Sequence, residues 1–231
     1  MSIIDCPSPN FDSRNGQAID MLVLHYTGMR TADDARDRLC NPDHEKKVSA
    51  HYFVDEDGKT YRLVEESNRA WHAGVSSWRG HTNINERSIG IEIVNPGHEY
   101  GYTPFPDVQM MAVAELSREI IACHSIEPRN VVGHSDVAPT RKEDPGELFD
   151  WPFLAQWGVG IWPEVDPKTI GAGQNFDPSA VHGLLEEYGY DTHNIAKTIT
   201  AFQRHFRPKL LSGLWDMECD AILKTLLDDI G

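Results

Sequence analysis

Short hydrophobic runs in the first two thirds of the chain predict a set of buried β-strands. Residues 21–26 and 88–94 are apolar at nearly every position, as is the shorter run 130–133, which is typical of strands covered on both faces. Residues 48–54 predict a further strand, and Asp57-Gly58 favours a hairpin turn to a return strand over 60–64. An arm rich in Pro, Asn, Asp and Ser precedes them, and we expect it to be irregular over 7–17.

Other segments place their hydrophobic residues at helical spacing. Residues 31–40 predict a helix with Thr31 as its N-cap and acidic residues in its first turn. Residues 106–124 predict the clearest helix of this half, and its hydrophobic positions are Val108, Met111, Ala112, Leu116 and Ile120. Strands separated by helices and one hairpin predict an α/β fold, a central mixed β-sheet flanked by helices.

The pattern changes after Trp151, which predicts a second, smaller domain. Glycine and proline interrupt residues 158–175, and we interpret this stretch as a linker between a domain over 1–157 and one over 176–231. The second domain is expected to hold three short helices. The first begins at Asp177-Pro178 and stops at Gly189, the second ends before Pro208, and the third covers 219–230.

Composition excludes several classes of partner. A formal charge of -15 argues against nucleic-acid binding and against docking on anionic membranes, because both partners attract basic surfaces. The four cysteines, at positions 6, 40, 123 and 219, form no CxxC motif, and we expect free thiols in a reducing compartment. The chain starts without a secretory signal and has no long apolar run, which predicts a cytoplasmic protein; a removed leader would instead place it in the periplasm or at the outer membrane.

One loop combines residues that suit a metal. His134 follows the strand 130–133, and Asp144 lies on the same loop, which Pro139 and the pair Pro145-Gly146 are expected to keep out of helix and sheet. Imidazole nitrogen and carboxylate oxygen are ligand types that suit zinc. The alternative is a solvated surface loop, because an Arg-Lys-Glu-Asp run is also typical of an exposed segment.

A third ligand can come from another strand end. His25 closes the run 21–26 as His134 closes its own, and side chains at strand ends gather at one edge of an open sheet. A His-His-Asp set leaves one tetrahedral position free, as in a catalytic zinc site. Each histidine taken alone is better explained by a structural role, since the chain has eleven.

Two charged residues are candidates for acid–base chemistry. Glu92 interrupts the apolar run 88–94, and a carboxylate there costs several kcal/mol, roughly, unless it is paired or protonated. Such a residue suits a general base, and the alternative is an edge strand on which Glu92 faces solvent. Lys142 lies two residues before Asp144 and could stabilise an oxyanion or be an ordinary surface lysine.

Aromatic, amide and imidazole side chains between the strands are candidates for substrate contacts. Such groups stack on sugars and hydrogen-bond to peptides, although loop tryptophans also pack between a loop and the core. These candidates are His51, Trp71, His72, Trp78, Asn83 and Asn85.

Taken together, these pieces resemble a known family, the zinc-dependent N-acetylmuramoyl-L-alanine amidases of the amidase-2 type, and within it the AmpD/AmiD-like branch. The resemblance covers about residues 20–152. It is carried by Leu24-His25-Tyr26, Val48-Ser49-Ala50-His51, the segment 69–76 (RAWHAGVS), the segment 85–93 with Ser88-Ile89-Gly90-Ile91-Glu92-Ile93, and the segment 134–146 (HSDVAPTRKEDPG).

The resemblance implies one Zn²⁺ per chain, held by His25, His134 and Asp144. It also implies that Glu92 acts as general base, that Lys142 stabilises the transition state, and that the chain hydrolyses the amide between N-acetylmuramic acid and L-alanine. The expected partners are peptidoglycan fragments, in the 1,6-anhydro form if the enzyme recycles them in the cytoplasm, and the chain is expected to be a monomer.

The same residues also fit other functions. The tail resembles a peptidoglycan-binding helical module through segments such as 201–208 (AFQRHFRP), although such modules also serve as structural lids. A recognition protein without catalysis, an exported amidase that acts on intact wall, and a zinc peptidase that cleaves within the stem peptide are the competing functions.

Overall fold

The structure is a computed structural model that describes residues 2–165, 177 and 179–230. A six-stranded sheet forms its centre, in the order β1-β5-β4-β7-β3-β8. Its strands are β1 (Ile3–Asp5), β3 (Met21–Tyr26), β4 (Tyr52–Val54), β5 (Thr60–Arg62), β7 (Ser88–Ile93) and β8 (Val131–Gly133). Only β4 and β5 pair antiparallel within this sheet, so it is mixed, which confirms the predicted fold class.

The N-terminal arm is more regular than its composition predicts. Residues Phe11–Ser13 form β2, which pairs antiparallel with β6 (Asn68–Ala70) in a separate two-stranded sheet, and β1 extends the edge of the main sheet. The prediction of an irregular arm over 7–17 was therefore wrong at residues 11–13 and holds for the rest of that range. These strands have three residues each, too few to show a hydrophobic period, and they exist because a partner strand supplies their hydrogen bonds.

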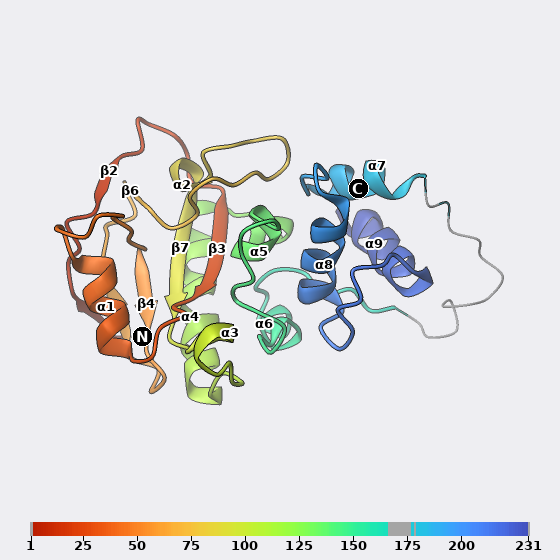
Figure 1. Cartoon of the computed structure of the whole chain (residues 1–231). Coiled ribbons are helices and arrows are strands. Elements are labelled where there is room, and N and C mark those ends of the chain that lie inside the picture. Colours follow the sequence, from red (N-terminus) through yellow and green to blue (C-terminus); the bar gives the residue numbers. More distant parts are fainter. Residues whose placement is uncertain (1, 166–176, 178, 231) are drawn as a thin grey trace.

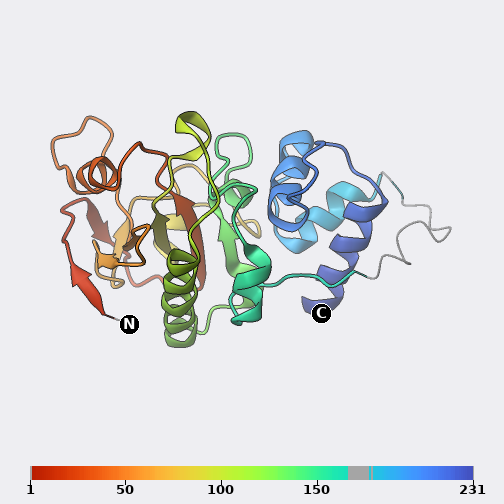
Figure 2. The same cartoon turned by 90° about the horizontal axis from the view of Figure 1, so that it is seen from below.

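Helices cover both faces of the main sheet (Figures 1 and 2). On one face, α4 (Asp107–His124) and α6 (Trp151–Gln156) pack on the side chains of β3, β4 and β7. On the other face, α1 (Ala32–Cys40) covers the half around β4 and β5. The short helices α2 (Ile84–Arg87), α3 (Gly97–Tyr100) and α5 (His134–Val137) and a 3-10 turn (Pro128–Asn130) complete this part.

Along the two central strands, β3 and β7, alternate side chains point into the hydrophobic core or toward the opposite face, which carries polar residues. Side chains on a strand point alternately to the two faces of the sheet, so Leu24 and Ile91 enter the core beneath α4. Their neighbours His25 and Glu92 face the opposite side and are directly paired in the register of β3 and β7. The strands are covered on both faces, as predicted, but polar residues occupy one of those faces.

The described residues 179–230 form three helices, as predicted: α7 (Val181–Tyr188), α8 (Ile195–Phe206) and α9 (Met217–Ile230). They lie beside α5 (Figure 1) and share one hydrophobic core with α5 and β3, in which Met21 and Val23 pack together with Leu185 and Phe202. Because β8 is the edge strand next to β3, these helices also cover Val132.

Several predicted boundaries change. Helix α7 begins at Val181 rather than at the Asp177-Pro178 pair, of which Pro178 lies outside the described residues, whereas Gly189 ends the helix as predicted. The predicted linker 158–175 lies partly outside the described residues as well, and the division at 157 and 176 stays a prediction. Strand β4 covers only the end of the predicted run 48–54, because the backbone at Ser49 bonds to Trp71 instead of to a neighbouring strand of the main sheet.

The helices also depart from prediction in two places. The loop 134–146 contains one helical turn, α5, which starts directly at the end of β8. In α4, Val108 is 54% exposed, so the buried face is rotated from the one predicted and includes Met110 and Val113 along with Leu116 and Ile120. Val108 faces outward from the same turn whose next residues, Gln109 and Met110, are buried against the sheet.

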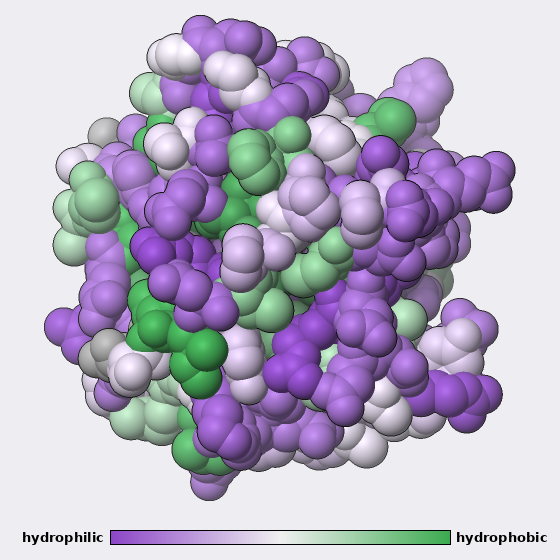
Figure 3. Space-filling model, turned by 90° about the vertical axis from the view of Figure 1, so that its left-hand side faces the viewer, coloured by the Kyte–Doolittle hydropathy of each residue, from purple (hydrophilic) through white to green (hydrophobic). Residues whose placement is uncertain are grey.

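The surface agrees with the acidic composition. Figure 3 faces the end of the molecule at which α1 and β2 lie, and hydrophilic residues cover most of it. Among the described residues, no helix has the length and hydrophobicity that crossing a bilayer requires. The four cysteines are free, as predicted.

Candidate metal centre and its cavity

Three side chains from separate parts of the chain meet at one point. His25 at the end of β3, His134 at the start of α5 and Asp144 on the following loop are all buried. The two Nδ1 atoms are 2.9 Å apart, and Oδ2 of Asp144 lies 3.0 Å from each of them. We call this group the His-His-Asp cluster. The sequence predicted these three residues as one set, and the fold brings them together.

The sheet and the loop fix these positions. Strands β3 and β8 are parallel neighbours, so His25 and His134 emerge at the same edge of the sheet. The chain then turns through α5 and returns, and the backbone N–H of Ser135 donates to the carbonyl of Asp144 at 2.9 Å. This hydrogen bond ties the backbone of the third residue to that of the second.

The outer nitrogens of both histidines are engaged. Nε2 of His134 lies 3.0 Å from the carbonyl oxygen of Ala73, which can only accept, so Nε2 carries the proton. The Ser88 hydroxyl donates to Ile84 and therefore accepts from Nε2 of His72. Neutral His72 must then accept at Nδ1, and the donor is Nε2–H of His25, 3.0 Å away.

These assignments leave both Nδ1 atoms of the cluster without protons. Two lone pairs then face each other and a carboxylate, an arrangement that repels unless a cation or a proton lies between them. Burial, together with the neighbouring His134, lowers the pKa of His25 to about 4, which disfavours the proton. Burial alone would raise the pKa of Asp144, but the adjacent His134 and His25 outweigh it and hold that pKa well below its ordinary value. The donor set therefore fits a zinc ion.

A glycine makes room for His72 in this chain of hydrogen bonds. A Cβ atom on Gly90 of β7 would stand 2.5 Å from the His72 ring, so another residue at position 90 would displace the ring. Burial lowers the pKa of His72 well below its ordinary value, which keeps the ring neutral and able to accept from His25. His72 is thus positioned to orient a metal ligand, a role that the sequence did not indicate.

Replacing His72 with phenylalanine should weaken zinc binding. The ring would still fill the space over Gly90, but His25 would lose the acceptor that fixes its orientation, and loss of such a partner costs about 10- to 100-fold in metal affinity. Competition with a chelator measures the change. The control is His193→Phe, at an exposed histidine between α7 and α8 that lies outside the cluster. Equal zinc affinity in both variants would contradict the orienting role.

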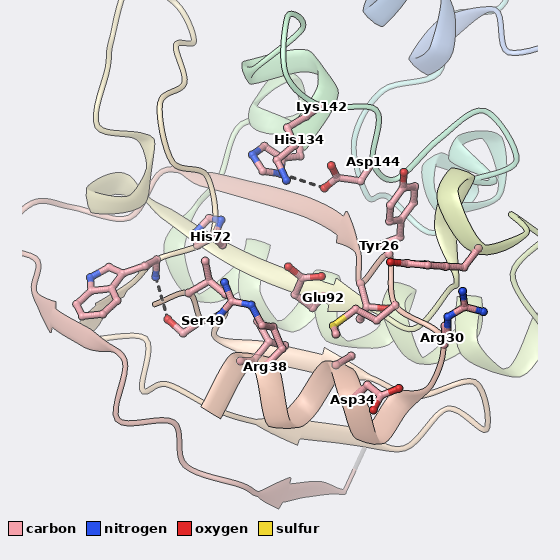
Figure 4. A pocket seen from close by; sticks show the side chains of 18 residues that line it. Tyr26, Arg30, Asp34, Arg38, Ser49, His72, Glu92, His134, Lys142 and Asp144 are labelled. Carbon is pink, nitrogen blue, oxygen red and sulfur yellow. Dashed lines mark hydrogen bonds and ion pairs between the residues drawn. The ribbon is translucent and has the colours of Figure 1, made fainter. Parts of the chain in front are cut away.

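A cavity of about 460 Å³ opens over the cluster and runs toward α1. Figure 4 shows Glu92 on the sheet below His134 and Asp144, and Lys142 on the loop above them. Strand β7 is interior, between β4 and β3, so the alternative of a solvent-facing Glu92 on an edge strand does not hold. Burial, reinforced by the charge of Asp144, raises the pKa of Glu92 to about 8, although Lys142 opposes the rise.

The residues predicted to contact substrate divide into two groups. Trp71 and His72 line the cavity, and Asn85 supports them from outside by accepting from the backbone N–H groups of His72 and Ala73. The others do not reach it. His51 is fully buried and accepts from the backbone of Gly90. Because burial and the charge of Arg14 lower its pKa to about 3, we expect it to stay neutral.

The remaining two candidates lie elsewhere. Trp78 is 1% exposed and packs edge-to-face on Tyr190, so it belongs to the core beneath the C-terminal helices. Asn83 is exposed and begins α2 in the left-handed conformation, in a surface hollow away from the cluster. The structure therefore places neither side chain at the cavity, because the composition of a polar loop does not indicate the direction in which each side chain points.

Other cavity residues were not predicted. Tyr26, at the end of β3, and Arg38, on α1, both line the cavity with Ser49. Burial and the charge of Asp144 raise the pKa of Tyr26 to about 12, so its hydroxyl stays protonated. Tyr26 could have been predicted, because it directly follows His25 at a strand end. Arg38 could not, because it resembles the other charged residues of α1.

Comparison with known protein families gives one match that covers the cluster. Residues 15–147 match the family model Amidase_2, described as N-acetylmuramoyl-L-alanine amidase. The matched segment contains His25, Glu92, Lys142 and both loop residues of the cluster, and it ends before the three C-terminal helices.

Individual relatives extend the similarity over most of the chain. The N-acetylmuramoyl-L-alanine amidase AmiD of Escherichia coli K12 is 41% identical over 236 residues, which cover 92% of this chain and 84% of AmiD. The 1,6-anhydro-N-acetylmuramyl-L-alanine amidase AmpD of Haemophilus influenzae is 34% identical, over 64% of this chain and 90% of its own length.

Two solved structures are also similar to this chain over most of its length. AmiD of E. coli, in complex with the substrate anhydro-N-acetylmuramic acid-L-Ala-D-γ-Glu-L-Lys, superposes with a TM-score of 0.82 at 39% identity and covers 95% of this chain and 91% of its own. AmpDh3 of Pseudomonas aeruginosa gives a TM-score of 0.80 at 31% identity, over 96% and 94% of the two chains.

Proposed function

The chain belongs to the N-acetylmuramoyl-L-alanine amidase family Amidase_2, and from this premise we propose that it is a zinc amidase that releases stem peptides from anhydro-muropeptides. The bond cleaved is the amide between N-acetylmuramic acid and L-alanine. Relatives named as anhydro-muramyl amidases, and a related structure in complex with an anhydro-muropeptide, support this substrate class.

One observation carries the proposal: a carboxylate with a raised pKa faces the same cavity as three residues that suit zinc. Glu92 pairs in register with His25, and Asp144 and Lys142 line the same cavity. His25, His134 and Asp144 would hold the ion. When bound, zinc lowers the pKa of water and polarises a carbonyl, which suits amide hydrolysis at neutral pH.

The side chains of Glu92 and Lys142 then perform the remaining steps of the reaction. Burial raises the pKa of Glu92 to about 8 in the metal-free chain, and the positive charge of a bound zinc ion would lower it toward neutral pH, where a group both takes and returns a proton efficiently. Glu92 accepts the proton of the attacking water and passes it to the departing amine of L-alanine. The ammonium of Lys142 faces the cavity and stabilises the negative charge that develops on the carbonyl oxygen.

The direct test uses the compound anhydro-N-acetylmuramic acid-L-Ala-D-γ-Glu-L-Lys. Mass spectrometry should find free L-Ala-D-γ-Glu-L-Lys and intact anhydro-N-acetylmuramic acid. Cleavage within the peptide would identify a peptidase instead, and binding without turnover in the zinc-loaded protein would identify a recognition protein. Faster release from intact sacculi than from the anhydro compound would contradict the proposed substrate form and, with it, the predicted cytoplasmic site of action.

Replacing Lys142 with methionine should shift the pH profile. The ammonium favours the ionised form of Glu92, so its loss raises the pKa of Glu92 further. Because the general base works only when ionised, the acidic limb of kcat/KM should move to higher pH, and the plateau should fall as the oxyanion loses its cation. Lys197→Met, at an exposed lysine of α8, is the control and should leave the limb unchanged. An unmoved limb in Lys142→Met would refute the coupling of Lys142 to Glu92.

A further inference from the structure

The loop of the His-His-Asp cluster contains a buried carboxylate that the reaction does not use. Asp136 is 0% exposed and follows His134 by two residues, yet it lines none of the cavity over the cluster. Its Oδ2 accepts from the backbone N–H of Gly133 at 2.7 Å, which caps the first turn of α5. A carboxylate without solvent requires further donors, and helix α8 and the connection between α7 and α8 provide them.

Two buried side chains from that part of the chain bind Asp136. The hydroxyl of Tyr190 donates to Oδ1 at 2.7 Å, and Nδ1 of His205 lies 2.7 Å from Oδ2. Tyr190 and His205 are 3% and 5% exposed. The His205 ring also stacks on Trp151, with centroids 3.8 Å apart and planes at 17°, so its position is fixed from both sides.

Through α5 this carboxylate controls the geometry of two cluster residues. Asp136 anchors the turn whose first residue is His134, and Ser135, which lies between the two, donates its backbone N–H to the carbonyl of Asp144. A shift of the turn would therefore move both loop ligands relative to His25, which is held separately by the sheet. The spacing of the cluster depends on where the C-terminal helices place α5.

Helix α8 contacts the same loop at a second place. Arg204, 7% exposed, has nitrogens 3.6 Å from carboxylate oxygens of Glu143 and of Glu147, the residues on either side of Asp144 and its turn. These distances are longer than hydrogen bonds, so the attraction is a Coulombic one of moderate strength.

We propose that the C-terminal helices position the metal-binding loop, and that Tyr190 and His205 do so through Asp136. The proposal rests on the zinc site proposed above. It gives this part of the chain a role in the reaction that requires no contact with glycan. Tyr190 and His205 are positioning residues, because they act on His134 and Asp144 through α5 and touch neither substrate nor metal.

The test compares two tyrosines that differ by one contact. Tyr190→Phe removes the hydroxyl that donates to Asp136, whereas Tyr188→Phe removes one from a ring that is buried beside it and is not bonded to Asp136. In the full chain, Tyr190→Phe should weaken zinc binding about tenfold, the lower end of the effect of an outer-shell partner, and Tyr188→Phe should leave it unchanged. Chelator competition gives the affinities, and thermal unfolding gives Tm for both.

Hydrogen exchange of the metal-free chain tests the same contact independently of zinc. The amides of Ser135 and Ala138 should exchange faster in Tyr190→Phe than in Tyr188→Phe. If the wild-type chain binds no zinc, the proposed zinc site fails, and this exchange result alone decides whether the helices hold the loop. If zinc affinity and exchange are equal in the two variants while Tm falls in both, Tyr190 is merely a core residue and the proposal is overturned.

His205 provides a rescue. His205→Asn places a side-chain amide near the position of Nδ1 and can still donate to Asp136, whereas His205→Phe keeps a ring against Trp151 but has no donor. We expect His205→Asn to bind zinc more tightly than His205→Phe. The reverse order would show that ring packing, and not the hydrogen bond to Asp136, sets the loop, and would also overturn the proposal.

Discussion

Replacing Glu92 with glutamine will lower kcat by at least about 100-fold while one zinc ion per chain stays bound. A positioned general base contributes roughly 10²- to 10⁴-fold, and glutamine keeps the size of the side chain but cannot take a proton. Glu92 is not one of the three residues of the His-His-Asp cluster, so the donor set for zinc remains intact. Steady-state hydrolysis of the anhydro-muropeptide, together with metal analysis of the same sample, measures both quantities.

The control for this variant is Asp34→Asn. Asp34 lines the same cavity at its α1 end and loses the same charge, but it is exposed and lies on a different wall from Glu92. Its kcat should stay near that of the wild type. A Glu92→Gln enzyme with near-normal kcat would remove Glu92 from the mechanism, and a zinc-free one would make it part of the metal site instead.

Replacing Asp144 with alanine will weaken zinc binding by more than the roughly 100-fold that an outer-shell partner can cost, and hydrolysis will be lost with the metal. The carboxylate supplies the one anionic donor of the cluster, and without it two neutral imidazoles face the ion. Two ligands do not complete a catalytic zinc site, which ordinarily has three from the protein. Chelator competition again measures the affinity.

The control for Asp144→Ala is Glu99→Ala. Glu99 is an exposed carboxylate on α3 that lines a neighbouring hollow with Asp144, so the two variants lose the same charge in the same region. Zinc affinity should fall in Asp144→Ala alone. Stoichiometric zinc in the Asp144→Ala chain at the wild-type affinity would show that the ligand assignment is wrong.

The sequence predicts this fold well where the hydrophobic pattern of one segment is enough to indicate a strand or a helix. Met21–Tyr26 forms the predicted strand, and Asp107–His124 and Ile195–Phe206 form helices where their apolar spacing predicts them. The three-residue strands β1, β2 and β6 could not be predicted, because each depends on a partner that lies far away in the chain.

The three residues of the His-His-Asp cluster could be predicted from the sequence, but the residues that hold its loop in place could not. His25 and His134 each end an apolar run, a position that can be identified in the sequence. The partners of Asp136 lie 54 and 69 residues away, and nothing near Tyr190 or His205 indicates them. Two tryptophans also differ in the direction of their side chains: Trp71 lines the cavity, whereas Trp78 enters the core. This difference depends on the path of the loop rather than on its composition.

The core shared between β3 and the C-terminal helices also affects how this protein can be made on the ribosome. Synthesis proceeds from the N-terminus, so Met21 and Val23 emerge well before their packing partners in α7 and α8. Until those helices emerge, the hydrophobic residues at the start of a central strand lack part of their cover, and exposed hydrophobic surface of this kind is where a holdase chaperone binds.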